Sequence, residues 1–231
     1  MSDMSSDARQ AGGRDYAGRT LGERRAQRRE ALIEAGVVIF GDHGFRGATV
    51  KAICRQAGLT ERYFYESFTN SEALFATVYK TLVGAIETEM RDAVEQAPAE
   101  AEAMSEAALR VYFTHMARPR VARIVLIEIF GISAGIDRTY RATTLKFAQL
   151  TEDLTARLFD QSVVSAQGTT PRLLSMGLVG STIHIAMYWN LNGYRETIDA
   201  VVNSALALYR AMAFSMVEPA GHERGRARST D

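Results

Sequence analysis

The sequence has little of what disulfide-linked, secreted or membrane proteins need. Cys54 is its only cysteine, so no disulfide can form within the chain. A lone cysteine is typical of a reducing compartment. No apolar run reaches the ~18 residues of a membrane-spanning helix, and the polar N-terminus lacks the apolar segment of a secretion signal. We therefore expect a cytoplasmic protein that does not bind membranes.

Lysine is also scarce, and net charge is zero. Only three of the 27 basic residues are lysines, and this arginine bias, with abundant alanine, indicates a GC-rich bacterial genome. The charge is unevenly spread. Residues 14–29 hold six arginines and two acidic residues, whereas residues 87–106 hold seven acidic residues and one arginine. A zero total can thus hide a basic end suited to DNA and an acidic middle; the alternative is that both are ordinary solvated helix faces.

The residue patterns of catalysis are missing as well. None of the four histidines (His43, His115, His184 and His222) has another His, Cys or Glu at metal-ligand spacing. There is no glycine-rich phosphate loop and no Gly-x-Ser-x-Gly motif. Cys54 lies on a helical pattern with inward-facing neighbours, which favours a small core residue over a nucleophile. The sequence predicts neither an enzyme nor a metal or cofactor site.

What the chain does have is a helix-turn-helix pattern near its N-terminus. A helix is expected over Thr49–Gln56, with Thr49 as N-cap and Gly58 in the left-handed turn that follows. Thr60 is expected to cap a second short helix. On that helix Phe64 and Phe68 are four residues apart, so both should point into the core. Helix, glycine-containing turn and helix together form the helix-turn-helix signature.

A long helix should follow directly. Thr69 and Glu72 fit the capping-box pattern, and apolar spacing continues from Ser71 to about Gln96, where Pro98 stops it. Upstream, a helix is expected over about Leu21–Asp42. These helices define a DNA-binding domain over residues 21–70.

The residues over about 30–75 resemble the tetracycline-repressor (TetR) family. The run AGLTERYFYESFTNSEALF (57–75) has that family's Ala-Gly, Ser or Thr, aromatic-rich stretch and Glu-Leu helix start. Five upstream residues also match the family's first helix and turn: Ala35, Phe40, Gly44, Phe45 and Thr49. The chain departs from the family at Arg62 and Tyr63, where Gly and then Thr or Ser are frequent, and in having no lysine near Ser71.

A DNA interface follows from the motif and the resemblance. In helix-turn-helix proteins the N-terminal residues of the second helix meet base edges, and Arg62 is the best candidate because arginine pairs bidentately with guanine. The resemblance implies phosphate contacts by Thr49 and Tyr65. The full predicted DNA-binding set is Thr49, Thr60, Glu61, Arg62, Tyr63, Tyr65, Ser67 and Ser71. Glu61 and Glu66 are acidic on this helix, which leaves open an alternative: a helical ligand- or protein-binding dimer with a degenerate DNA-binding unit.

The rest of the chain reads as a larger helical domain over residues 71–217. Its helices are expected over about 71–96, 99–118, 136–159, 172–192 and 194–217. A further helix should start at Pro119 and be interrupted by Gly131 and Gly135. The segment 172–192 is apolar on nearly every side, so it should be buried on more than one side. The resemblance implies that this helix and the last one form a four-helix interface in a homodimer.

A ligand pocket is expected among the helices of residues 99–192, lined mostly by apolar groups. The candidates are Tyr112, His115, Met116, Phe130, Tyr140, Phe147, Met176, His184 and Met187. For each of them ordinary core packing is the competing interpretation.

The combined prediction is an all-α protein: an N-terminal three-helix helix-turn-helix DNA-binding domain followed by a larger helical ligand-binding and dimerisation domain. Residues 1–20 are expected to be a flexible arm, whose arginines reach a minor groove or remain a plain tail, and residues 218–231 a flexible tail. The resemblance implies a transcriptional regulator, most often a repressor, that binds a palindromic double-stranded DNA operator as a homodimer and is released by a small, largely apolar effector. The effector, the operator and the target genes cannot be read from the sequence.

Overall fold

The computed structural model describes residues 20–158 and 170–217, and over these residues the chain is helical and contains no strand. The prediction of an all-α fold is confirmed. None of the described helices is long and apolar enough to cross a membrane. The predicted tail 218–231 and all but the last residue of the predicted arm 1–20 lie outside the described residues.

In chain order the elements are α1 (Leu21–Gly47), α2 (Val50–Ala57), α3 (Glu61–Ser67), α4 (Ser71–Gln96), α5 (Ala101–Met116), α6 (Pro119–Ala122), the π-helical turn η1 (Arg123–Ile127), α7 (Ala134–Leu158), α9 (Pro171–Leu191) and α10 (Ile198–Val217).

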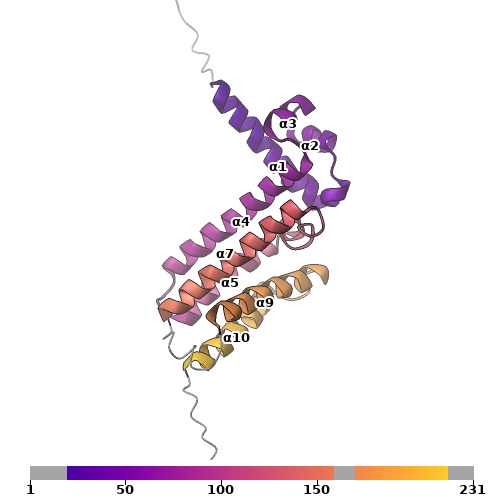
Figure 1. Cartoon of the computed structure of the whole chain (residues 1–231). Helices are drawn as coiled ribbons and strands as arrows, with labels where there is room; N and C mark the ends of the chain where they lie inside the picture. The colour runs from indigo at the N-terminus through magenta and orange to yellow at the C-terminus, as the bar shows by residue number, and fades with distance from the viewer. Residues whose placement is uncertain (1–19, 159–169, 218–231) are drawn as a thin grey trace, which may run out of the picture.

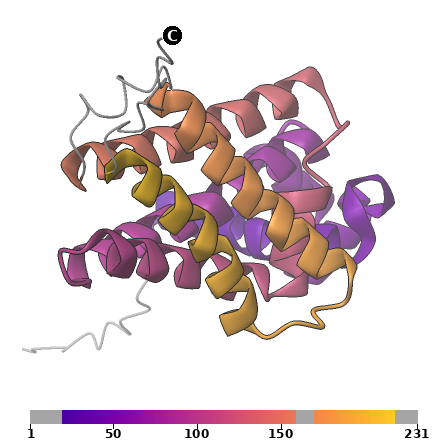
Figure 2. The same ribbon diagram turned by 90° about the horizontal axis from the view of Figure 1, so that it is seen from below.

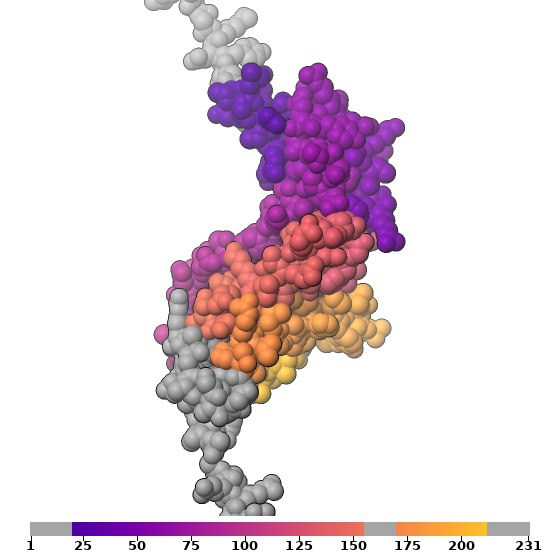
Figure 3. All heavy atoms as spheres, in the orientation of Figure 1, coloured from indigo at the N-terminus to yellow at the C-terminus, as the bar shows by residue number. Residues whose placement is uncertain are grey.

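Helices α1, α2 and α3 form a small unit at one end of the molecule (Figure 1). Helix α4 begins beside this unit and runs into the larger helical body, where α5 and α7 pack near it. The space-filling view shows the N-terminal unit projecting from the rest (Figure 3). Helices α9 and α10 pack on each other and lie across the opposite face (Figure 2). Helix α4 is therefore the one long element that belongs to both parts.

The breaks around the helix-turn-helix follow local backbone chemistry. Gly44 has φ +73° and ψ 171°, so α1 is interrupted where the sequence predicted its end, although one further turn follows to Gly47. The Thr49 hydroxyl accepts a hydrogen bond from the Ala52 amide at 3.1 Å and caps α2. Gly58 ends α2 in the left-handed conformation, with φ +65°. Both glycines thus hold conformations that a side chain would strain.

Two predicted caps are wrong. Thr60 precedes α3, but its side chain makes no capping hydrogen bond. Helix α4 is capped by Asn70, whose Oδ1 accepts from the Ala73 amide at 2.8 Å, because the cap must directly precede the first helical residue and Thr69 lies one residue too early. Glu72 does not complete a capping box and instead accepts a hydrogen bond from the Ser133 hydroxyl at 2.5 Å.

The larger domain differs from the prediction between residues 119 and 136. The expected single helix is instead the short α6 followed by the π-helical turn η1, which ends at Ile127. Gly135 does not interrupt a helix but lies in the first turn of α7. The Ser133 hydroxyl accepts from the amides of Gly135 and Ile136, each at 3.2 Å, and so starts α7 before that glycine.

The last helix begins later than expected. Tyr194 has φ +57°, outside the right-handed helical region. The Thr197 hydroxyl accepts from the Ala200 amide at 3.2 Å and provides the cap. Helix α10 therefore starts at Ile198 rather than Tyr194.

Candidate DNA interface and ligand cavity

Helix α3 is anchored by one face and open on the other. Phe64 and Phe68 are buried in the core, as predicted. Tyr65 is 58% exposed and packs edge-on against the Phe64 ring, with the ring centroids 5.3 Å apart. The Arg62 side chain is 85% exposed. The core aromatics thus hold α3 in place while Arg62 and Tyr65 face outward.

Arginines of α1 contact α3 and the residue that follows it. The Arg25 guanidinium donates to the Glu66 carbonyl oxygen at 2.8 Å. The Arg28 guanidinium lies 4.3 Å from the centre of the Tyr63 ring, a cation–π contact. Arg29 lies over the Phe68 ring at 4.9 Å. Three arginines of the basic segment therefore support α3 directly, a role that the sequence pattern did not reveal.

The acidic residues of α3 differ in their surroundings. Glu66 accepts a hydrogen bond from Arg62 Nε at 3.1 Å, and Arg28 Nη2 lies 3.8 Å from its other carboxylate oxygen. Glu61 is exposed at the start of the helix. Because Glu66 is surrounded by arginines, it adds little net negative charge to the surface. An exposed i,i+4 pair contributes only ~0.3–0.5 kcal/mol, so a DNA phosphate or base can replace Glu66 as the partner of Arg62.

The predicted DNA-binding residues lie on or beside the helix-turn-helix. Thr49, Thr60, Glu61, Arg62 and Tyr65 are exposed, whereas Tyr63, Ser67 and Ser71 are half-buried. Thr49 uses its hydroxyl to cap α2, and the Arg28 guanidinium covers one face of the Tyr63 ring. The Arg62 side chain is therefore more accessible from outside the protein than that of Tyr63.

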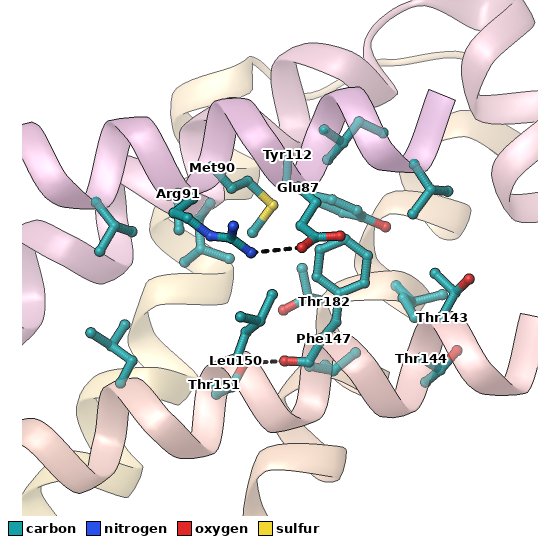
Figure 4. A pocket seen from close by; sticks show the side chains of 18 of the residues that line it. Glu87, Met90, Arg91, Tyr112, Thr143, Thr144, Phe147, Leu150, Thr151 and Thr182 are labelled. Carbon is teal, nitrogen blue, oxygen red and sulfur yellow. Dashed lines mark hydrogen bonds and ion pairs between the residues drawn. The ribbon is translucent and has the colours of Figure 1, made fainter. Parts of the chain in front are cut away.

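A cavity of about 280 Å³ lies within the larger domain, between α4, α5, α7, α9, α10 and η1. Figure 4 shows Glu87 and Arg91 paired at its edge on α4, with Phe147 and Thr151 on a helix that faces them. Its wall is mainly apolar and includes Val83, Ile86, Met90, Leu109, Val125, Leu126, Phe147, Leu150, Val179 and Ile183. The volume and composition suit a small, largely apolar molecule.

The structure brings three of the nine predicted ligand-binding residues to this wall: Tyr112, Tyr140 and Phe147. The other six do not line the cavity. His115 is buried with its Nε2 2.8 Å from a Glu89 oxygen, and Met116 is a core residue. Phe130 is exposed and packs on Tyr140 with centroids 4.8 Å apart. The exposed His184 bonds through Nδ1 to the Gly180 carbonyl at 2.8 Å, and Met176 and Met187 are half-buried on other sides of α9.

Several wall residues were not predicted, because Tyr79 and Tyr209 lie outside residues 99–192 and Thr182 is on a different side of α9 from the residues named there. Tyr79 belongs to α4, and Thr182 and Tyr209 belong to the helices expected to form the dimer interface. Burial raises the pKa of Tyr79 to about 12, opposed by a hydrogen bond with Thr143. Burial also raises the pKa of Tyr209, whose hydroxyl lies 3.4 Å from that of Thr182. These hydroxyls give the apolar cavity a small polar portion.

A set of polar contacts joins the end of α1 to the α6–η1 segment. We call it the junction and define it by Asp42, Phe45, Arg120, Arg123 and Glu128. Arg120 donates twice to the Asp42 carboxylate, at 2.7 and 2.9 Å, and holds its pKa below the usual value. Glu128 accepts from the Phe45 amide at 2.8 Å and from Arg123 Nε at 3.0 Å. Arg123 also donates to the Asp42 carbonyl oxygen at 2.9 Å.

The junction and the cavity share one short element. Val125 and Leu126 of η1 lie on the cavity wall, and Arg123 of the same turn belongs to the junction. Turns of π-helix are rare and frequently mark functional sites. A displacement of η1 by a molecule in the cavity would therefore act directly on the end of α1.

Comparison with known proteins agrees with this arrangement. Residues 32–78 match the family described as bacterial regulatory proteins, tetR family. The HTH-type transcriptional activator FasR of Mycolicibacterium smegmatis is 24% identical over 211 residues, which cover 89% of this chain and 93% of FasR.

Solved structures show the same fold. The fatty acid degradation regulator FadR of Bacillus halodurans superposes with a TM-score of 0.69 at 17% identity, covering 79% of this chain and 94% of that one. FadR of Bacillus subtilis, in complex with stearoyl-CoA, superposes with a TM-score of 0.68 at 17% identity, covering 78% and 96%. The matched family and these relatives are regulators of transcription rather than enzymes. The helix-turn-helix geometry and this match agree that residues 32–78 are similar to the DNA-binding part of bacterial regulatory proteins of the TetR family.

Proposed function

We propose that the chain is a ligand-controlled transcriptional repressor that binds a palindromic operator as a homodimer and leaves it when a small, largely apolar molecule fills the cavity. The observation that carries this proposal is the sharing of η1 between the cavity wall and the junction. Residues 21–70 would bind DNA, and residues 71–217 would bind the ligand and the second subunit. As a DNA-binding regulator it would act in the cytoplasm.

The ligand would be a molecule with a hydrocarbon chain. The wall is mainly apolar, and it narrows the candidates to molecules that can fill about 280 Å³ with hydrocarbon. The structurally similar FadR of Bacillus subtilis was solved with stearoyl-CoA, which supports an acyl chain as the type of occupant. Transfer of such a chain from water would supply most of the binding free energy.

The homodimer would form through α9 and α10. These helices lie side by side on one face (Figure 2), and both leave large apolar side chains exposed: Leu173, Tyr188, Leu191 and Leu208. A two-fold interface uses the same patch on both subunits. It would set two α3 helices on one side of the dimer, as a palindromic operator with half-sites about 34–36 Å apart, or a multiple of that, requires.

Repression would follow from occupancy of a promoter. The helices described here serve DNA binding, ligand binding and dimerisation, and a dimer that covers a promoter needs no other surface to block transcription. The relative FasR is an activator, so a promoter–reporter assay is the deciding measurement. Higher expression after deletion of the regulator is the expected result, and lower expression would assign activation instead.

The proposal is tested by DNA selection followed by titration. Fragments bound from a genomic DNA pool are expected to share a palindrome, and the protein should bind them as a dimer in sedimentation. Affinity should fall steeply with salt, because each neutralised phosphate adds ~0.9 to the log–log slope. A flat and weak salt response would favour the degenerate DNA-binding unit. Undiminished operator affinity with ligand bound would exclude ligand-controlled release.

Arg62→Ala provides the test of base readout. Loss of a bidentate contact to guanine should cost about 1–3 kcal/mol of operator binding and relax the preference at one position of each half-site. Selection from a randomised operator pool measures that preference. An equal loss of affinity on every sequence would make Arg62 a phosphate contact instead.

A further inference from the structure

The hydroxyl of Tyr112 has an unusual position in the cavity wall. Its oxygen is fully buried and has no hydrogen-bond partner among residues 20–158 and 170–217. Buried polar groups in folded proteins nearly always have a partner, and leaving one without costs free energy. A group that belongs to a bound molecule would satisfy this hydroxyl.

Two other hydroxyls near it are already used within the protein. Tyr79 is hydrogen-bonded to Thr143, and the Tyr209 hydroxyl lies 3.4 Å from that of Thr182. Tyr112 is close enough to Tyr140, Tyr79 and Tyr209 to interact with them electrostatically. The wall therefore contains a group of tyrosines in which the Tyr112 hydroxyl remains available to a ligand. A phenol hydroxyl donates one hydrogen bond, so its natural partner is an oxygen acceptor.

The charged groups of the wall argue against an anionic acceptor. The wall includes Glu87, Glu95 and Asp153 but only one cation, Arg91, among the described residues. Arg91 is paired with Glu87 at 2.7 Å, and Lys146 pairs with the other oxygen of the same carboxylate, also at 2.7 Å. A carboxylate beside Tyr112 would be buried without a free cation, which is strongly unfavourable. Burial also raises the pKa of Tyr112 itself, so the site favours neutral groups generally.

We infer that the ligand presents an uncharged oxygen acceptor, such as a ketone, ester or thioester carbonyl or an alcohol, to the Tyr112 hydroxyl, and that Tyr112 selects for this group on a hydrocarbon chain. This inference rests on the proposed ligand-binding function of the cavity. The chain contacts the apolar wall, and Tyr112 recognises the single polar atom that enters it. A free fatty acid is excluded as the preferred ligand, although its hydrocarbon chain would fit.

The first measurement needs no ligand. Tyr112→Phe removes one oxygen atom that has no partner, so the Tm of the ligand-free protein should be unchanged or higher. Tyr209→Phe is the matched control, because its hydroxyl contacts Thr182, and its Tm should fall. A clear fall in Tm for Tyr112→Phe would show that the protein already satisfies this hydroxyl and would overturn the inference.

The second measurement compares probes of one chain length by isothermal titration. The wild-type protein should bind 2-decanone about tenfold more tightly than decane or decanoate, and Tyr112→Phe should lower that affinity about tenfold while decane binding stays the same. Decanoyl-CoA is measured alongside 2-decanone. Comparing their affinities shows whether the protein prefers the carbonyl of a thioester or that of a free neutral molecule. Binding of decanoyl-CoA, if found, must show the same dependence on Tyr112.

Tyr194→Phe, which removes a hydroxyl bonded to Asn190 outside the cavity wall, should retain the preference for 2-decanone. Tighter binding of decanoate than of 2-decanone, or equal affinities of wild type and Tyr112→Phe for 2-decanone, would refute the role of Tyr112. Operator release by any of these probes is scored separately. Release of the operator that does not depend on Tyr112 would contradict this inference but support the proposed function. Binding that depends on Tyr112 but causes no release would support this inference and contradict ligand-controlled release.

Discussion

Gly44→Ala is expected to destabilise the protein by about 3 kcal/mol. It should also weaken the effect of a ligand in the cavity on operator binding. Gly44 has φ +73° and ψ 171°, a region almost restricted to glycine, where another residue costs about 1–3 kcal/mol. An added Cβ would also lie 2.5 Å from Glu128 Oε1 and 2.9 Å from Arg123 Nη2. Glu128 would have to move and would lose its bond to the Phe45 amide.

Gly131→Ala is the matched control for this substitution. Gly131 has nearly the same φ, +74°, but nothing lies within 4 Å of its added Cβ among the described residues. Its cost should be backbone strain alone, about 1 kcal/mol. Urea unfolding measures the difference in stability, and operator binding with and without ligand measures the coupling. Equal losses for the two variants, with ligand response retained, would mean that the junction carries no coupling.

Phe64→Ala is expected to have the largest effect on the DNA-binding domain. Phe64 is completely buried between α3 and the rest of the core, and truncation of a buried phenylalanine typically costs about 3–5 kcal/mol. The loss should unfold or loosen α3 and abolish operator binding. Far-UV circular dichroism during urea unfolding gives the free energy, and operator binding gives the functional loss.

Tyr65→Ala is the neighbouring control. Tyr65 is 58% exposed, so its removal should change stability by less than about 1 kcal/mol. Operator affinity should nevertheless fall on all sequences alike, because a phosphate contact carries no base preference. A loss of stability as large as that of Phe64→Ala would assign Tyr65 to the core rather than to DNA.

The helix-turn-helix could be predicted because its signals are local. Gly58, Thr49 and the spacing of Phe64 and Phe68 each act within one or two helical turns, and the structure agrees with all of them. Both ends of α4 also agree with the pattern of apolar residues and Pro98. The capping residue was missed because Asn70 and Thr69 have similar local chemistry, and only the backbone conformation separates them.

The cavity and the junction depend on how distant helices meet, which no local pattern states. Tyr112, Tyr140 and Phe147 were predicted from their type and reached the wall, whereas Met176 and Met187 have the same chemistry and lie on other sides of α9. The pairing of Arg120 with Asp42 joins residues 78 apart in the chain. Such contacts depend on how each helix is rotated about its axis. A helix that is apolar on nearly every side has no single apolar face, so its sequence does not indicate which side faces the cavity.

The unbroken length of α4 has a geometric consequence for the choice of DNA sites. Its 26 residues span about 39 Å at 1.5 Å per residue. A tilt of only about 5° at the cavity end would therefore move the DNA end by about 3.4 Å, which is the rise of one base pair. In the proposed dimer, a small displacement of the wall by a ligand would therefore move the two α3 helices out of register with their half-sites. One base pair inserted between the half-sites should for the same reason lower operator affinity sharply.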